Sequence, residues 1–319
     1  MTRKILYILP LFISLFIMGE LYGQQAPVFT QYYSTYMFSN PAYAGIRQGI
    51  CVIGLYRQQW AGGFNDEDGY NMAPQDILLS LDSPLKALHG GLGGSVIQDR
   101  LGYQSDIVVQ VDYSFHLNLS FGTLGLGAGI NLINRSIDGS KFKPVQLHDP
   151  ILPTSAVSDM RIDASAGLFL NQQGRYYFGF SVANILESGF KKFDPSGKSI
   201  TSTDRTFYIE GGYHFVIPRN PLFEITPSVM ILSDVASTQY NLTGIVSYND
   251  KFWGGINYRF QESVGFIVGV RFKDFRISYS YDLNTLPVSI PGSHEVVLGY
   301  CFKLKHERSK TSYKNTRYL

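Results

Sequence analysis

Charge is scarce in this sequence, and charge of one sign does not accumulate over most of its length. Asp, Glu, Lys and Arg make up 16% of the 319 residues, whereas a soluble domain usually carries about 25%. The formal net charge is only +2, and Lys and Arg gather only in the last fifteen residues. A nucleic-acid partner is therefore not expected, because nucleic-acid-binding domains present a basic patch or stripe.

Motifs that carry catalysis or bind cofactors are also missing. The six histidines show no metal-ligand spacing, and no nucleophile elbow, phosphate-binding loop or dinucleotide fingerprint stands in its proper context. Gly122–Gly129 is glycine-rich but alternates with apolar residues, which indicates a strand, and the acidic cluster Asp66–Asp68 indicates a solvated loop rather than a calcium site. We expect no enzyme activity, cofactor or metal. A lipid-modifying enzyme would need a Ser/His or acid/His pair near an outer rim, and none can be located.

Long apolar runs are absent after the first residues, which have the form of a secretory leader. Arg3 and Lys4 are basic, Ile5–Met18 is apolar, and Gly23 closes a plausible cleavage site. We predict a signal peptide over residues 1–23. The alternative is an uncleaved anchor, but the apolar run is short for a spanning helix of ~20 residues. If the mature chain lies in a membrane, it must cross it as strands.

Aromatic residues and glycine are abundant instead, and apolar and polar side chains alternate over most of the chain. Tyr and Phe supply 22 residues each and Gly 32. The segment 107–119 places Val109 and Val111 on one face and Gln110 and Asp112 on the other, as a strand does. About fourteen segments alternate in this way: 49–60, 74–83, 89–99, 104–119, 122–133, 160–172, 174–184, 204–217, 222–234, 237–249, 251–262, 264–273, 274–284 and 293–304.

These segments predict an all-β fold, an antiparallel transmembrane β-barrel of about 14 strands over residues 49–304. Most are near the ~9–11 residues of a tilted transmembrane strand, and single-chain bacterial barrels have an even number of strands. A soluble β-sandwich or propeller would also alternate. Either would favour charge on its polar face, whereas that face here is often Gly, Ser, Thr or Asn.

The connections between the segments also favour a barrel. The long connections, at 61–73, 134–159, 185–203 and 285–292, each follow an odd-numbered strand, and connections after even-numbered strands are short. Bacterial barrels have short periplasmic turns and long outer loops. This parity therefore predicts an outer-membrane protein whose N- and C-termini are both periplasmic.

If the apolar face of the barrel meets lipid, the opposite face lines the lumen. That face carries charges of both signs: Arg57, Asp112, His116, Arg161, Asp163, Glu210, His214, Glu224, Arg259, Arg271, Arg276 and Asp282. Mixed signs argue against a strongly selective ion pore. Two interpretations stay open. The charges satisfy one another around water or a plug, since buried charges need partners, or the lumen is a conduit or a socket for a bound segment.

The chain has two cysteines, Cys51 and Cys301, in the first and last predicted strands. Closing a barrel makes these strands antiparallel neighbours, and both cysteines fall toward the periplasmic ends and point inward. An oxidising periplasm permits a disulfide there, so we predict a bridge across the closing seam. The alternative is two unrelated small core residues.

An aromatic segment, residues 24–48, precedes the first strand. Its residues 29–45 read FTQYYSTYMFSNPAYAG and lack a clean period of two. Asn40-Pro41 favours a turn, and Gly45 offers backbone freedom. Because exposed aromatic side chains are costly in water, the segment either packs into the lumen or periplasmic mouth as a plug or waits for a partner. At the other end, residues 305–319 are expected to form a disordered, basic periplasmic tail.

The same N-terminal segment carries a family resemblance. Its motif resembles the N-terminal signature of the PorP/SprF family of outer-membrane barrels, with Gln31, Tyr32, Asn40, Pro41, Ala42, Tyr43, Ala44 and Gly45 as the matching residues. The resemblance implies a role in type IX secretion and gliding motility in Bacteroidota. It also implies that a plug or a partner surface includes these residues.

The resemblance further implies a function without catalysis, namely helping to export cargo proteins or to anchor them at the cell surface. The implied partners are outer-membrane lipid, type IX secretion components and a secreted surface cargo protein. The rival function is a general porin or a channel for hydrophobic solutes.

Overall fold

The computed structural model describes residues 26–47, 49–67, 69–142, 153–193, 201–286 and 290–303. The predicted leader, residues 1–23, and the predicted basic tail, residues 305–319, lie outside the described residues and stay predictions. Within the described ranges, no helix is both long and apolar enough to span a membrane.

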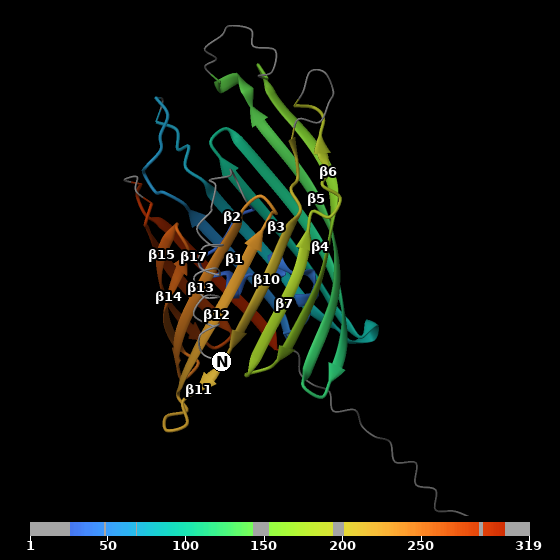
Figure 1. Ribbon diagram of the computed structural model, residues 1–319, viewed down its shortest axis with the longest axis vertical. Helices are drawn as coiled ribbons and strands as arrows, with labels where there is room; N and C mark the ends of the chain where they lie inside the picture. The colour runs from blue at the N-terminus through green and yellow to red at the C-terminus, as the bar shows by residue number, and fades with distance from the viewer. Residues whose placement is uncertain are drawn as a thin grey trace, which may run out of the picture.

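Antiparallel strands make up most of the structure (Figure 1). In chain order they are β1 (Gly49–Gln58), β2 (Gln75–Leu85), β3 (Gly90–Leu101), β4 (Gln104–Leu119), β5 (Gly122–Asp138), β6 (Ala156–Gln172), β7 (Tyr176–Ala183), β10 (Thr206–Tyr213), β11 (Phe215–Val216), β12 (Phe223–Ser233), β13 (Thr238–Tyr248), β14 (Phe252–Arg259), β15 (Ser263–Phe272), β16 (Phe275–Asn284) and β17 (Ser293–Lys303). A separate two-stranded sheet joins β8 (Gly189–Phe190) to β9 (Thr201–Ser202).

The main sheet closes into a ring. Neighbouring strands pair antiparallel, β1 pairs with β17, and β10 pairs with β12. The sheet has 15 strand segments, but β10 and β11 are one strand interrupted at His214, so the ring has fourteen strands. The predicted fourteen-stranded antiparallel barrel is confirmed, and an open sandwich or a propeller is excluded.

Alternation along the strands gives the barrel an apolar outside and a polar inside. On β4, Val111 is 61% exposed whereas Asp112 is 1% exposed, and the same contrast runs around the ring. An apolar band of this extent is unfavourable in water. It fits hydrocarbon, which a closed barrel can cross because every strand has both of its backbone edges paired.

The long connections lie together at one end of the barrel, at the top of Figure 1. They join β1 to β2, β5 to β6, β7 to β10, and β16 to β17, as the sequence predicted. We call this the long-loop end and the opposite one the short-turn end. Short helical turns occur in two connections, η3 (Lys86–Leu88) and η4 (Gly139–Lys141).

One predicted connection is wrong in its bounds. β5 runs to Asp138 and β6 begins at Ala156, so the connection predicted at 134–159 is shorter. Polar residues interrupt the alternation of apolar and polar side chains in this stretch, but the backbone pairing of β5 with its neighbours continues through it. Arg135 lies opposite Asp106 on β4 and forms an ion pair with it at 2.7 Å.

Two further expectations differ locally from the structure. The connection predicted at 185–203 contains the small β8–β9 sheet. The strand predicted at 204–217 is broken at His214, whose amide donates to the carbonyl of Arg175, next to the neighbouring strand β7. The His214 ring lies 2.7 Å from Glu224.

Candidate functional site

Residues 26–47 lie inside the ring, and we call them the lumenal segment. They form three short helical turns, η1 (Tyr32–Ser34), α2 (Tyr36–Ser39) and η2 (Pro41–Tyr43). Ala26 lines a cavity together with Trp60 and Leu286 at the long-loop end, whereas Gly45 packs on Gly91 toward the short-turn end. The segment therefore crosses the lumen before β1 begins, and the described chain starts at the long-loop end.

Asn40 and Pro41 set the bend of the lumenal segment. The proline disfavours helix at the residue before it, and Asn40 is extended, with φ −142° and ψ 110°. Its side-chain oxygen accepts from Ala42 N at 3.0 Å, while its amide nitrogen donates to Leu168 O on β6 at 3.1 Å. One side chain thus caps η2 and ties it to the barrel wall.

Glycines on the inner wall receive the motif. A Cβ on Gly127 would come within 2.2 Å of Ala42 N, and one on Gly91 would come within 2.3 Å of Ala44 O. The motif's own Gly45 has φ +69°, and a side chain there would meet Gly91 Cα at 2.5 Å. The lumenal segment therefore lies where the wall lacks side chains, and its small residues face these gaps.

Polar wall residues satisfy backbone carbonyls of the motif. Ser114 Oγ donates to Ala42 O at 2.8 Å, and Ser181 Oγ donates to Ser39 O at 2.6 Å. His116 Nε2 lies 2.9 Å from Ala44 O, in hydrogen-bonding contact. These partners take the place of water for a backbone that is buried in the lumen.

An aromatic cluster fixes the middle of the segment. Tyr36, Tyr43, Phe169 and Tyr177 pack with neighbouring ring centroids 5.0 to 5.6 Å apart. Tyr36 also donates through its hydroxyl to Tyr177. Aromatic pairs of this kind add about 0.5–1.5 kcal/mol beyond their buried area, so the cluster holds α2 firmly against β6 and β7.

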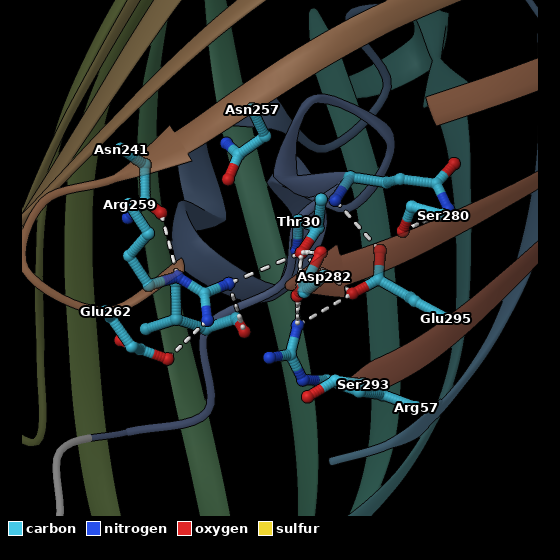
Figure 2. A network of polar contacts seen from close by, with 12 residues as sticks. Thr30, Arg57, Asn241, Asn257, Arg259, Glu262, Ser280, Asp282, Ser293 and Glu295 are labelled. Carbon is cyan, nitrogen blue, oxygen red and sulfur yellow. Dashed lines mark hydrogen bonds and ion pairs between the residues drawn. The ribbon is translucent and has the colours of Figure 1, made fainter. Parts of the chain in front are cut away.

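A charged network binds the start of the segment in the half of the lumen toward the long-loop end (Figure 2). The backbone nitrogens of Thr30 and Gln31 donate to Glu295 at 2.9 and 2.8 Å. The Thr30 hydroxyl donates to Asp282 at 2.6 Å. Arg57 lies between the two carboxylates, 3.2 Å from Glu295 and 3.3 Å from Asp282.

The network is fully enclosed. The side chains of Arg57, Asp282 and Glu295 are at most 2% exposed. Arg259, also buried, donates to Val28 O at 3.3 Å and pairs with Glu262 at 2.6 Å. Removing one partner from a buried ion pair leaves an uncompensated charge and costs about 3–5 kcal/mol, so the lumenal segment and the wall depend on one another.

Gln31 of the motif is anchored beside this network. Its side-chain amide donates to Ser280 at 3.3 Å, and its side-chain oxygen accepts from Ser278 at 2.5 Å. Tyr32, the next motif residue, makes a 2.9 Å hydroxyl contact with Ser228 on β12. The two halves of the motif therefore bind different parts of the wall, β16 and β12 for one and β3 to β7 for the other.

The predicted lumen charges fall into three groups. Arg57, His116, Glu210 and Arg259 contact the lumenal segment, with Glu210 accepting from Ser39.

A second group of the predicted lumen charges forms its hydrogen bonds away from the lumenal segment. Asp163 accepts from Leu186 N at 2.9 Å and from the Thr203 hydroxyl at 2.8 Å, and Arg161 donates to Gly189 O at 2.6 Å, so both hold the β7–β10 connection. Asp112 accepts from Gln110 at 2.9 Å.

The remaining predicted charges lie toward the short-turn end. His214 contacts Glu224 at 2.7 Å. Arg271 pairs with Asp250, and Arg276 lies over the ring of Trp253, 5.2 Å from its centroid. These three therefore do not join the network around Thr30.

The structure joins Cys51 and Cys301 by a disulfide. The two residues are direct cross-strand partners in the β1–β17 ladder, with Cα atoms 4.1 Å apart. The predicted bridge thus lies across the seam that closes the ring. It stays a prediction for the protein in its membrane.

Sequence reasoning missed Glu295 and the wall glycines. Glu295 shares the inward face of β17 with Val297, and that alternation was the available signal. Gly125, Gly127 and Gly129 share one face of β5, opposite an outward row of apolar residues. The sequence predicts a strand from this pattern, but it does not predict that these glycines leave the space in which the motif packs.

The described residues contain no group of three or more His, Cys, Asp or Glu side chains placed to hold a metal ion. The functional groups that the site presents are buried charge pairs, hydroxyls and aromatic rings.

Comparison with known proteins gives one family and several barrels. The family model described as "Type IX secretion system membrane protein PorP/SprF" matches residues 21–300. No curated protein matches the chain. The toluene transporter TbuX of Ralstonia pickettii has a TM-score of 0.52 at 13% identity, covering 84% of this chain and 93% of its own. The outer membrane protein Omp33 of Acinetobacter baumannii has a TM-score of 0.46 at 8% identity, with 81% and 100% covered. At these identities the likeness to TbuX concerns the fold alone.

Proposed function

Because the chain belongs to the PorP/SprF family of type IX secretion system membrane proteins and folds as an outer-membrane β-barrel, we propose that it is a non-enzymatic accessory of type IX secretion. In this role it helps to export a cargo protein or to anchor it at the cell surface. Its partners are secretion components and the cargo, and its surroundings are outer-membrane lipid.

The observation that carries this proposal is the position of the family motif. The motif lies inside the barrel, and the buried network of Arg57, Asp282 and Glu295 binds the segment that leads into it. A lumen filled in this way favours the role of a scaffold that presents its loops to other proteins over the role of a pore for solutes. We assign the plug role to residues 24–48 on this basis.

The rest of the predicted organisation belongs to the same proposal. Residues 1–23 are a removable leader, residues 49–304 are the barrel, and residues 305–319 are a periplasmic tail. β17 ends at the short-turn end, which fits a tail on the periplasmic side. The periplasmic N-terminus stays a prediction, since the described residues begin at Ala26, at the long-loop end of the lumen.

The experiment is affinity purification of the full chain from native outer membranes, followed by mass spectrometry of the proteins that co-isolate. Recovery of type IX components or one large secreted adhesin supports the proposal. Recovery of an isolated barrel that conducts ions in planar bilayers supports the porin instead.

A further inference from the structure

The inner wall carries a continuous row of charges toward the long-loop end. In cross-strand register the row reads Glu295, Arg57, Asp76, Asp99 and Asp106, on β17, β1, β2, β3 and β4. Glu295 pairs with Arg57, and Asp106 pairs with Arg135 at 2.7 Å. Asp76 and Asp99 are left opposite each other and share a hydrogen bond, which two carboxyls can form only when one of them holds a proton. If both were ionised, the like charges would destabilise the sheet.

Asp76 is a buried carboxylate without a cation of its own. It is 4% exposed, and no ion pair joins it to a basic side chain of the described residues. Its cross-strand neighbour Arg57 is already engaged by Asp282 and Glu295 at 3.3 and 3.2 Å. Its partner is the carboxyl of Asp99, with which it shares a proton, and a cation from outside can take the place of that proton between the two groups.

Both carboxylates line a cavity of about 600 Å³ between the lumenal segment and the long-loop end. Trp60 and Phe260 contribute aromatic rings to its lining. The cavity therefore offers acidic side chains and aromatic residues together.

A second cavity of about 180 Å³ adjoins the first, because Ala26, Pro27, Asp99 and Gln104 line both. Carboxylates outnumber guanidinium groups around the two cavities: the former are Asp76, Asp99, Asp106, Asp204, Asp234 and Glu262, and the latter Arg57, Arg135 and Arg259. All three arginines are ion-paired. The excess negative charge is thus available to a ligand.

We propose that this cavity binds a lysine or arginine side chain of a partner polypeptide that enters from the long-loop end. The cation lies between Asp76 and Asp99 and forms charge-assisted hydrogen bonds with them. An aromatic ring of the lining adds a cation–π contact. Since no three metal-ligating side chains gather in the described part of the chain, the site favours an organic cation over a metal ion.

This inference deepens the proposed function, because it gives the chemistry that a cargo or secretion component would present. The two can fail separately. Purified protein that binds a basic peptide but co-isolates with no secretion component would count against the proposed function alone.

The test uses the full chain in phosphatidylcholine nanodiscs, a fluorescent pentalysine peptide and fluorescence anisotropy. We expect pentalysine to bind and pentaglutamate not to bind. Asp76→Asn combined with Asp99→Asn should weaken pentalysine binding at least tenfold. Asp250→Asn removes an exposed acid at the short-turn end and should leave binding unchanged.

Two further measurements separate binding from folding. The Asp76→Asn/Asp99→Asn variant removes a repulsion, so its thermal midpoint should not fall below that of the wild type. Gln104→Lys introduces an ammonium at a position that lines both cavities, and it should also block pentalysine. Equal pentalysine binding by the wild type and the Asn variant, or binding of pentaglutamate, would overturn the proposal.

Discussion

Gly127 and Ala42 lie so close that a Cβ on the glycine would come within 2.2 Å of the Ala42 amide nitrogen. The contact joins β5 to the family motif across the lumen. Backbone lies at this distance, so neither side can move aside as a flexible side chain would. The wall and the lumenal segment are therefore shaped for each other at this point.

Gly127→Val should displace the motif while leaving the barrel closed. The strand keeps its ladder, but the new side chain overlaps η2 and overpacking of this kind costs about 1–3 kcal/mol. We expect a lower thermal midpoint and faster trypsin cleavage after Arg47, which in the wild type is held by Asp82 at 2.6 Å. Gly244→Val, at an open outward position, should change neither measurement.

Glu295→Gln should destabilise the protein strongly. Glu295 accepts from Thr30 N and Gln31 N and balances Arg57, and all of these groups are buried. Loss of its charge leaves the guanidinium undercompensated, at a cost of up to about 3–5 kcal/mol. Urea unfolding in detergent or liposomes measures the difference. An unchanged midpoint would show that the network does not hold the segment.

Asp163→Ala should loosen the β7–β10 connection without opening the barrel. Asp163 accepts from Leu186 N and from the Thr203 hydroxyl, at 2.9 and 2.8 Å. Hydrogen bonds to a charged group contribute about 1.5–3 kcal/mol each. Limited trypsin digestion should cut faster after Lys191 or Lys192. Asp234→Ala is the control, because the side chain of Asp234 accepts hydrogen bonds from Ser237 within its own turn.

The seam disulfide should be present in protein isolated from the outer membrane. Mass spectrometry without reduction should find the peptides of Cys51 and Cys301 linked. Two freely alkylated thiols in fresh, unreduced protein would contradict the bridge. Cys51→Ser with Cys301→Ser should leave the strand pairing intact, because the ladder continues on both sides of the bridge, for example from Ile53 to Gly299.

The barrel was predictable from the sequence because its signal is local. Val109, Val111 and their polar neighbours alternate within a few residues, and β4 spans the predicted 104–119. The alternation fails where polar residues continue a strand beyond the apolar band, as Arg135 does on β5. Sequence alone cannot distinguish such an extension from a loop.

The site was only partly predictable because its contacts are distant in sequence. Thr30 and Glu295 are separated by 265 residues, and no local pattern relates them. Inward charges such as Arg57 and Arg259 could be identified from alternation, but not the partners that they bind. The motif identified the lumenal segment in the sequence. The path of that segment through the lumen could not be predicted, because it depends on how the strands close into a ring.

Single-channel recording in planar bilayers tests the central claim most directly, comparing the wild type with a variant that lacks Phe29–Gly45. We expect the wild type, with its lumenal segment in place, to conduct no ions. We expect the deletion variant to show steady ion conductance. A wild type that conducts as well as the deletion variant would contradict it.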